Sequence, residues 1–157
     1  MRKRSKYRPK KVLVNPLGYV LEGLVPVAKH TDHLLKLKVR HHFSMANLTQ
    51  GKATRDDMDV LINMGNMSEA LYRMGFGTEY ASVIANGMPA LLAVCRRGAE
   101  TNRFILRSEE MRALNELIEL HDAQMEVVTV NDIDKAVVLI ERERQAKRTE
   151  LVVEKKE

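Results

Sequence analysis

The chain has 157 residues, the size of one ordinary domain, and its single cysteine, Cys95, excludes an internal disulfide. No run of residues approaches the roughly 20 consecutive apolar positions that cross a bilayer, and no apolar segment follows the charged start as in a secretion signal. We therefore expect a cytoplasmic protein with no membrane partner.

The net charge of +5 is unevenly distributed along the chain. Residues 1–12 hold no acidic residue and seven basic ones, which are Arg2, Lys3, Arg4, Lys6, Arg8, Lys10 and Lys11. Removing these seven from the 26 basic residues leaves 19 against 21 acidic residues, so the rest of the chain carries −2. Seven like charges repel one another and do not pack into a core, which predicts a flexible, disordered basic arm over residues 1–12.

Apolar residues after the arm recur at intervals of three and four and almost never alternate, a spacing typical of amphipathic helices. We predict an all-α fold in the form of a single-domain helical bundle. About five to six helices should occupy residues 13–148, and residues 149–157 should form a charged tail.

The first predicted helices precede Gly51. Asn15 and Pro16 fit the start of a short helix that ends near Gly23, and a long helix follows over Lys29–Gln50. Gly51 lies where its C-terminal cap belongs. The apolar arc of the long helix should face the core and consists of Leu34, Leu35, Leu37, Val39, Phe43, Met45, Ala46 and Leu48.

Two further helices are predicted before residue 98. Thr54 and Asp57 have the spacing of a shortened capping box, so a helix should run from about Arg55 to Met74. The next helix should cover residues 78–97, with a kink or break near Met88. The proline that follows Met88 removes an amide donor and clashes with the preceding turn.

The last part of the chain is predicted as a loop and two helices. Residues 99–107 should form a polar loop whose apolar trio, residues 104–106, docks as an extended bridge. Ser108 should cap a helix that continues to residue 128, since acidic residues follow it in the first turn. Asn131 should start a final helix that runs to residue 148.

The basic arm predicts contact with a polyanion, because cations that neutralise phosphates release condensed counterions. Tyr7 lies among these cations and could stack on an exposed base. A helix face that carries Lys29, His33, Lys36 and Arg40 could extend the footprint. The predicted nucleic-acid-binding residues are Arg2, Lys3, Arg4, Lys6, Tyr7, Arg8, Lys10, Lys11, Lys29, Lys36 and Arg40. The arm could instead be a solubilising tail or bind an acidic protein, and an ordinary solvated face is the favoured interpretation of the helix.

Three histidines, His41, His42 and His121, are expected to point into the core. Together with an acidic residue such as Asp122 they could bind zinc or iron inside a bundle, but the paired Glu-x-x-His repeats of di-iron bundles are absent. Core histidines that are hydrogen-bonded to a carbonyl or to Gln124 are the favoured interpretation. We predict no metal and no other cofactor.

No residue pattern predicts catalysis, so we expect a protein that is not an enzyme. The carboxylates of the helix after Ser108 are expected on a solvated face, without the shifted pKa values of catalytic groups. The thiol of Cys95 could have a lowered pKa beside Arg96 and Arg97, or it could be buried. Four of the nine methionines lie on the helix over residues 55–74, where they could fill the core or a subunit contact, which favours a homo-oligomer.

Three segments resemble a group of short proteins encoded by phages and prophages of Gram-negative bacteria. They are Met1-Arg2-Lys3-Arg4-Ser5-Lys6-Tyr7-Arg8-Pro9-Lys10, Arg96-Arg97-Gly98 and Leu120-His121-Asp122-Ala123-Gln124. The resemblance implies a phage context and no assigned activity. Our leading hypothesis is a non-enzymatic, oligomeric helical protein that binds nucleic acid through its arm. The alternative is an adaptor or inhibitor that engages a host protein through its methionine-rich or acidic helix faces and has no nucleic-acid role.

Overall fold

The computed structural model describes residues 21–146, and within them the all-α prediction is confirmed. Two single-turn 3-10 helices, η1 (Val27–Lys29) and η2 (Thr78–Tyr80), accompany five α-helices. The α-helices are α2 (Thr31–Thr49), α3 (Arg55–Arg73), α4 (Ala81–Thr101), α5 (Ser108–Val127) and α6 (Val130–Gln145). The predicted basic arm, the charged tail and most of the short helix after Pro16 lie outside the described residues, although residues 21–23 are helical. No helix in the described range combines the length and apolarity needed to cross a membrane.

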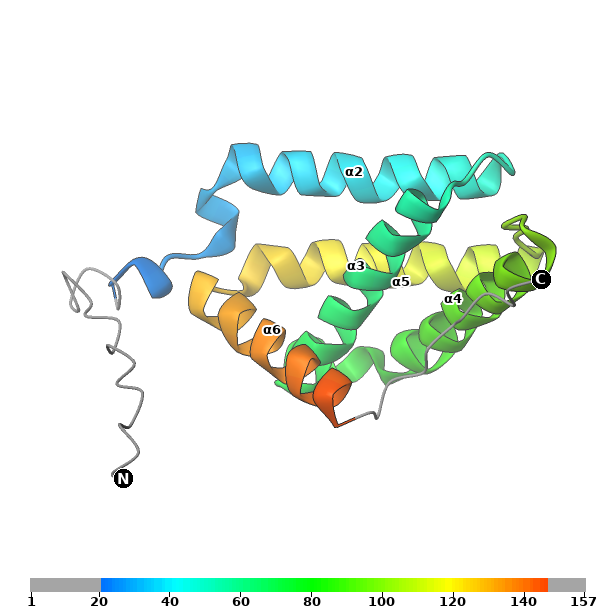
Figure 1. Cartoon of the computed structure of the whole chain (residues 1–157). Coiled ribbons are helices and arrows are strands. Elements are labelled where there is room, and N and C mark those ends of the chain that lie inside the picture. The colour runs from blue at the N-terminus through cyan, green and yellow to red at the C-terminus, as the bar shows by residue number, and fades with distance from the viewer. Residues whose placement is uncertain (1–20, 147–157) are drawn as a thin grey trace, which may run out of the picture.

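Helix α3 lies at the centre of the bundle and contacts each of the other four α-helices. In Figure 1, the axes of α2 and α5 are roughly parallel and their chain directions are opposite, α3 runs obliquely across them, and α4 and α6 diverge along the lower edge. This central position explains why α3 has buried residues along its length, from Asp57 to Leu71. Its ends contribute to different parts of the core.

The core is divided into two apolar clusters. The larger cluster joins α2, α3, α4 and α5 through residues such as Leu48, Leu61, Val94 and Leu117, each at most 1 % exposed. The smaller cluster joins α2, α3, α5 and α6 around Leu34, Leu71, Met125, Val128 and Ala136. Two separate clusters leave room for a less densely packed zone between them.

Local sequence signals set the ends of the helices around α3. The Thr54 hydroxyl accepts a hydrogen bond from the Asp57 amide, and the Asp57 carboxylate accepts one from the Thr54 amide, so the predicted capping box is confirmed. Gly51 and Gly75 follow α2 and α3 with φ of 69° and 104°. This left-handed conformation is strained for residues with a Cβ atom, which is why glycine ends both helices.

The predicted apolar arc of α2 is wrong in part. Leu34, Met45 and Leu48 are buried as predicted, whereas Leu35, Val39 and Phe43 are about 60 % exposed at 63 %, 59 % and 63 %. Two apolar stripes run along α2, and the packing helices α3 and α5 cover only one of them. The second stripe faces away from the core, because residues spaced by four share a helix face.

Of the kink or break predicted near Met88, the break does not occur, because α4 continues through Pro89 as one helix. The carbonyl of Ala85 is the group that loses its helical donor to the proline, and both Ala85 and Pro89 are exposed, so water can replace the missing bond. On the opposite side Gly87 approaches α5 closely, since a Cβ atom there would lie 3.0 Å from Leu117 Cβ. Helix α4 also extends to Thr101, which shortens the polar loop predicted from residue 99.

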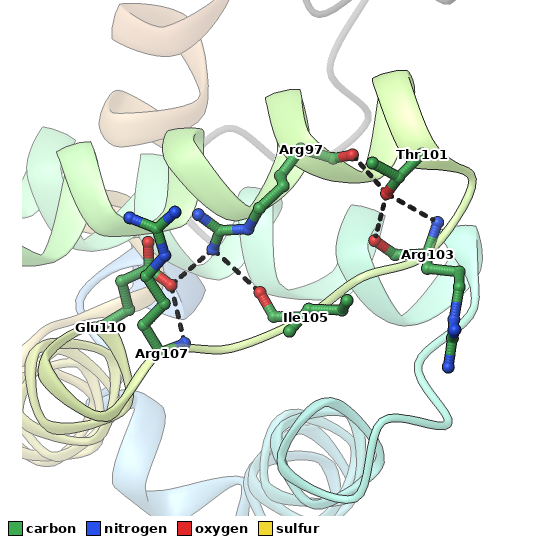
Figure 2. Close-up of polar contacts among 6 residues, drawn as sticks. All are labelled: Arg97, Thr101, Arg103, Ile105, Arg107 and Glu110. Atoms are coloured by element: carbon green, nitrogen blue, oxygen red, sulfur yellow. Dashed lines mark hydrogen bonds and ion pairs between the residues drawn. The ribbon is translucent and has the colours of Figure 1, made fainter.

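Arg97 of α4 forms hydrogen bonds to the α4–α5 connection and to α5, as Figure 2 shows. Its Nη2 donates to the carbonyl of Ile105 at 2.9 Å and to the carboxylate of Glu110 at 2.6 Å. The apolar trio docks in extended form as predicted, with Phe104 and Leu106 packed on the larger cluster and Ile105 exposed. The short connection therefore holds α4 and α5 together.

Two predicted helix starts are displaced in the structure. Arg107, and not Ser108, is the N-cap of α5, and its amide donates to Glu110 at 2.9 Å. The final helix is capped by Thr129 through a reciprocal pair with Asp132, and not by Asn131. This Thr-x-x-Asp motif repeats that of α3, so the sequence contained the signal for the correct start.

Candidate nucleic-acid interface and histidine pocket

The three described residues of the predicted nucleic-acid interface lie on η1 and on α2. Lys29 ends η1, Lys36 and Arg40 lie on α2, and all three are exposed. His33 lies between them on the same face and is exposed as well. The other predicted residues, Arg2, Lys3, Arg4, Lys6, Tyr7, Arg8, Lys10 and Lys11, lie outside the described residues.

Lys29, Lys36 and Arg40 have no acidic ion-pair partner among the described residues. Lys38, on another side of α2, does have one. Lys38 forms an ion pair with Glu126 of α5. His42, one helical turn on, contacts Asp122 of the same helix at 2.8 Å. These two contacts use the acidic face of α5 to hold α2 in place. Positive charge on the side of Lys36 and Arg40 consequently remains available to an external anion.

The exposed apolar stripe of Leu35, Val39 and Phe43 borders the basic face. Phe43 follows Arg40 by three residues, which places the two side chains next to each other on the helix surface. A cationic group beside an exposed aromatic ring is the combination that binds single-stranded nucleic acids, through phosphate contacts and base stacking. Phe43 was missed in the sequence, because its spacing from Val39 fits a buried stripe as well as an exposed one.

Two of the three histidines examined in the sequence come together inside the bundle. His41 of α2 and His121 of α5 are 5 % and 2 % exposed, and their ring centroids lie 5.1 Å apart in an edge-on arrangement. The predicted core position is confirmed for both. It is wrong for His42, whose side chain is 56 % exposed beside Asp122. Within the described residues no group of three or more His, Cys, Asp or Glu side chains is placed to hold a metal ion.

The histidine pair borders a pocket of about 440 Å³. Five elements form it, because η1, α2, α3, α5 and α6 each contribute lining residues. The lining residues are Val27, His30, His33, Leu37, His41, Asn63, Met64, Met67, His121, Met125, Val130 and Ile133. Met64 belongs to the larger core cluster and Met125 to the smaller one, so the pocket occupies the zone where the two clusters do not merge.

Three ring nitrogens of the His41–His121 pair lack hydrogen-bond partners. Neither Nδ1 nor Nε2 of His121 has one among the described residues, and Nδ1 of His41 has none either. The expected bond to Gln124 is absent, because Gln124 is engaged by Ser68 and by the carbonyl of Phe76. Burial, followed by the charge of the neighbouring His41, lowers the pKa of His121 to about 4, and burial also lowers the pKa of His41. Both rings are therefore uncharged at neutral pH.

Cys95 and the methionines of α3 are parts of the core. Burial, with a smaller contribution from Asp59, raises the pKa of the Cys95 thiol to about 11, so the alternative of an activated thiol is wrong. Met58 and Met64 are buried in the larger cluster, while Met67 and Met74 pack against the smaller one. The methionine side chains of α3 consequently pack against other helices of the chain itself.

Comparison of the chain with protein-family models, with curated proteins and with solved structures found no match.

Proposed function

We propose that this non-enzymatic helical protein binds nucleic acid without strong sequence preference, through the basic residues 1–12 and the exposed face of Lys29, Lys36 and Arg40. The observation that supports the proposal most is the contrast on α2 between cations with and without acidic partners. Lys38 is neutralised by Glu126, while Lys36 and Arg40 have no ion-pair partner among the described residues. An unpaired row of cations gains affinity for phosphates through counterion release.

Phe43 favours single strands as the substrate. Its exposed ring lies beside Arg40, and base–aromatic stacking contributes about 1–3 kcal/mol per base irrespective of the sequence. A duplex keeps its bases stacked inside and offers only phosphates to this face. Single-stranded DNA or RNA should therefore bind more tightly than a duplex of equal length.

Fluorescence anisotropy with labelled 20-mers, single- and double-stranded, at several salt concentrations tests the proposal. The variant Lys36→Glu/Arg40→Glu should bind more weakly and reduce the slope of log K against log salt by about two. Deletion of residues 1–12 should reduce the slope further, and Phe43→Ala should weaken single-strand binding alone. The control is Lys135→Glu, a charge reversal at an exposed lysine of α6, which should bind as wild type does. Salt-independent binding that is equal for all variants contradicts the proposal.

The exposed apolar stripe supports a second candidate, in which α2 contacts another protein. Leu35, Val39 and Phe43 are each more than half exposed, and contiguous apolar surface of this kind often marks a protein contact. The partner is either a second copy of the chain or a host protein, as expected of a phage-encoded adaptor. Leu35→Ser/Val39→Ser should then abolish complex formation in sedimentation velocity or in a pull-down from nuclease-treated lysate, while Lys36→Glu/Arg40→Glu leaves it intact. A complex that nuclease treatment removes and that Lys36→Glu/Arg40→Glu weakens favours nucleic acid.

A further inference from the structure

We propose that the pocket between η1, α2, α3, α5 and α6 binds a small uncharged molecule with an apolar body and one hydroxyl group, which the His41–His121 pair recognises. The proposal concerns a different site from the nucleic-acid face and does not depend on it. The two sites meet only at His33, which lies on the basic face and also lines the pocket.

The size and the walls of the pocket suit an apolar body. Its volume is about 440 Å³, whereas an apolar cavity of roughly 150 Å³ already accepts benzene. The walls come from apolar side chains, among them Val27, Met67 and Ile133, which are half-buried. Methionine side chains adapt to irregular shapes, so a substituted ring can be accommodated. Ligand sites in proteins typically combine such walls with a few polar groups.

The polar groups lie at the buried end of the pocket. His121 is 2 % exposed with both ring nitrogens unpaired, and His41 contributes a third unpaired nitrogen. Each of these nitrogens exposes less than 1 Å², so the two rings turn toward the pocket when a ligand binds. A buried donor or acceptor without a hydrogen-bond partner costs about 1–3 kcal/mol of free energy. A ligand that forms hydrogen bonds with these nitrogens removes part of that cost, which increases its affinity. The lining residues His30, His33 and Leu37 are exposed, so the pocket is open to solvent beside them and has an entrance there.

A hydroxyl group fits this pair better than a charged group does. An uncharged imidazole offers one N–H donor and one acceptor nitrogen. A hydroxyl can donate its proton to the acceptor nitrogen of one ring and accept a bond from the N–H of the other. A carboxylate would lose its hydration among apolar walls and meet no positive charge at the buried end, while a pure hydrocarbon would leave the nitrogens unpaired.

Isothermal titration of the full chain with three matched probes at pH 7.5 tests the proposal. The probes are 4-propylphenol, propylbenzene, which lacks only the hydroxyl, and 4-propylbenzoate. We expect the phenol to bind about tenfold more tightly than propylbenzene, as one net hydrogen bond provides, and more tightly than the benzoate. His121→Leu should still bind propylbenzene but lose the preference for the phenol, and Ile133→Trp should block both neutral probes by filling the pocket.

His42→Leu is the matched control, since it removes an imidazole that lies outside the pocket on the next position of α2. It should retain the tenfold preference. The proposal is overturned if wild-type protein binds no 4-propylphenol, binds both neutral probes equally, or binds the benzoate best. Loss of the preference in His42→Leu as well as in His121→Leu would also overturn it. The comparison of probes on wild-type protein decides the question even if His121→Leu does not fold.

Discussion

Replacing His121 with leucine should remove a large part of the acid sensitivity of the fold. Burial lowers the pKa of His121 to about 4, whereas the unfolded chain has the ordinary value near 6.5. Between these values the unfolded state binds a proton that the folded state does not, so the free energy of unfolding decreases as the pH falls from about 6.5 to about 4. A difference of about 2.5 pKa units corresponds to about 3 kcal/mol over the whole window, of which about 2 kcal/mol is lost by pH 5.

His121→Leu keeps a similar side-chain volume and has no proton to bind. At pH 7.5 the variant should be at least as stable as wild type, because two unpaired buried nitrogens are removed. His41 has a lowered pKa for the same reason of burial and retains its own contribution, which acts in the same direction. The pKa of Asp57 is also lowered, since hydrogen bonds to its carboxylate outweigh the effect of burial, so its contribution is lost only below the ordinary range of a carboxyl group.

Urea unfolding followed by circular dichroism at pH 7.5, 6.5, 5.5 and 4.5 measures this dependence. Between pH 7.5 and pH 5 the free energy of unfolding should decrease by the same amount in wild type and in His42→Leu. In His121→Leu the decrease should be smaller by about 2 kcal/mol. The reasoning is refuted if His121→Leu follows the wild-type curve, or if acidification through this window stabilises the wild-type protein.

Three further predictions concern packing. Gly98→Ala should destabilise the fold by about 1–3 kcal/mol in urea unfolding, because its Cβ would clash with the ring of Phe104; an unchanged midpoint would show that the ring moves freely. The Cys95 thiol, with a pKa of about 11, should react with a disulfide reagent at pH 8 only after unfolding in urea, and rapid labelling of the native protein would contradict its burial. Val39→Ser and Phe43→Ser should change stability by no more than about 0.5 kcal/mol, since both side chains are exposed; a loss above about 2 kcal/mol would place them in a core or an obligate interface.

Local sequence signals determined much of the helical framework. The spacing of apolar residues predicted α2, α3 and α5 within a few residues, and the capping box of Thr54 and Asp57 identified the start of α3. These features are predictable because a helix, its cap and its glycine stop depend on residues within one or two turns of each other. The same rule explains the displaced start of α6, where the Thr129–Asp132 motif was present and overlooked.

Only the tertiary structure decided which side of each helix is buried and which distant residues meet. The apolar stripes of α2 that contain Leu34 and Leu35 have equally helical spacing, and the choice between them was made by α3 and α5. His41 and His121 are 80 residues apart in the sequence, and no local pattern relates them. Periodicity reports that a helix has an apolar face, whereas burial, unpaired nitrogens and the pocket around them arise when other helices pack against it.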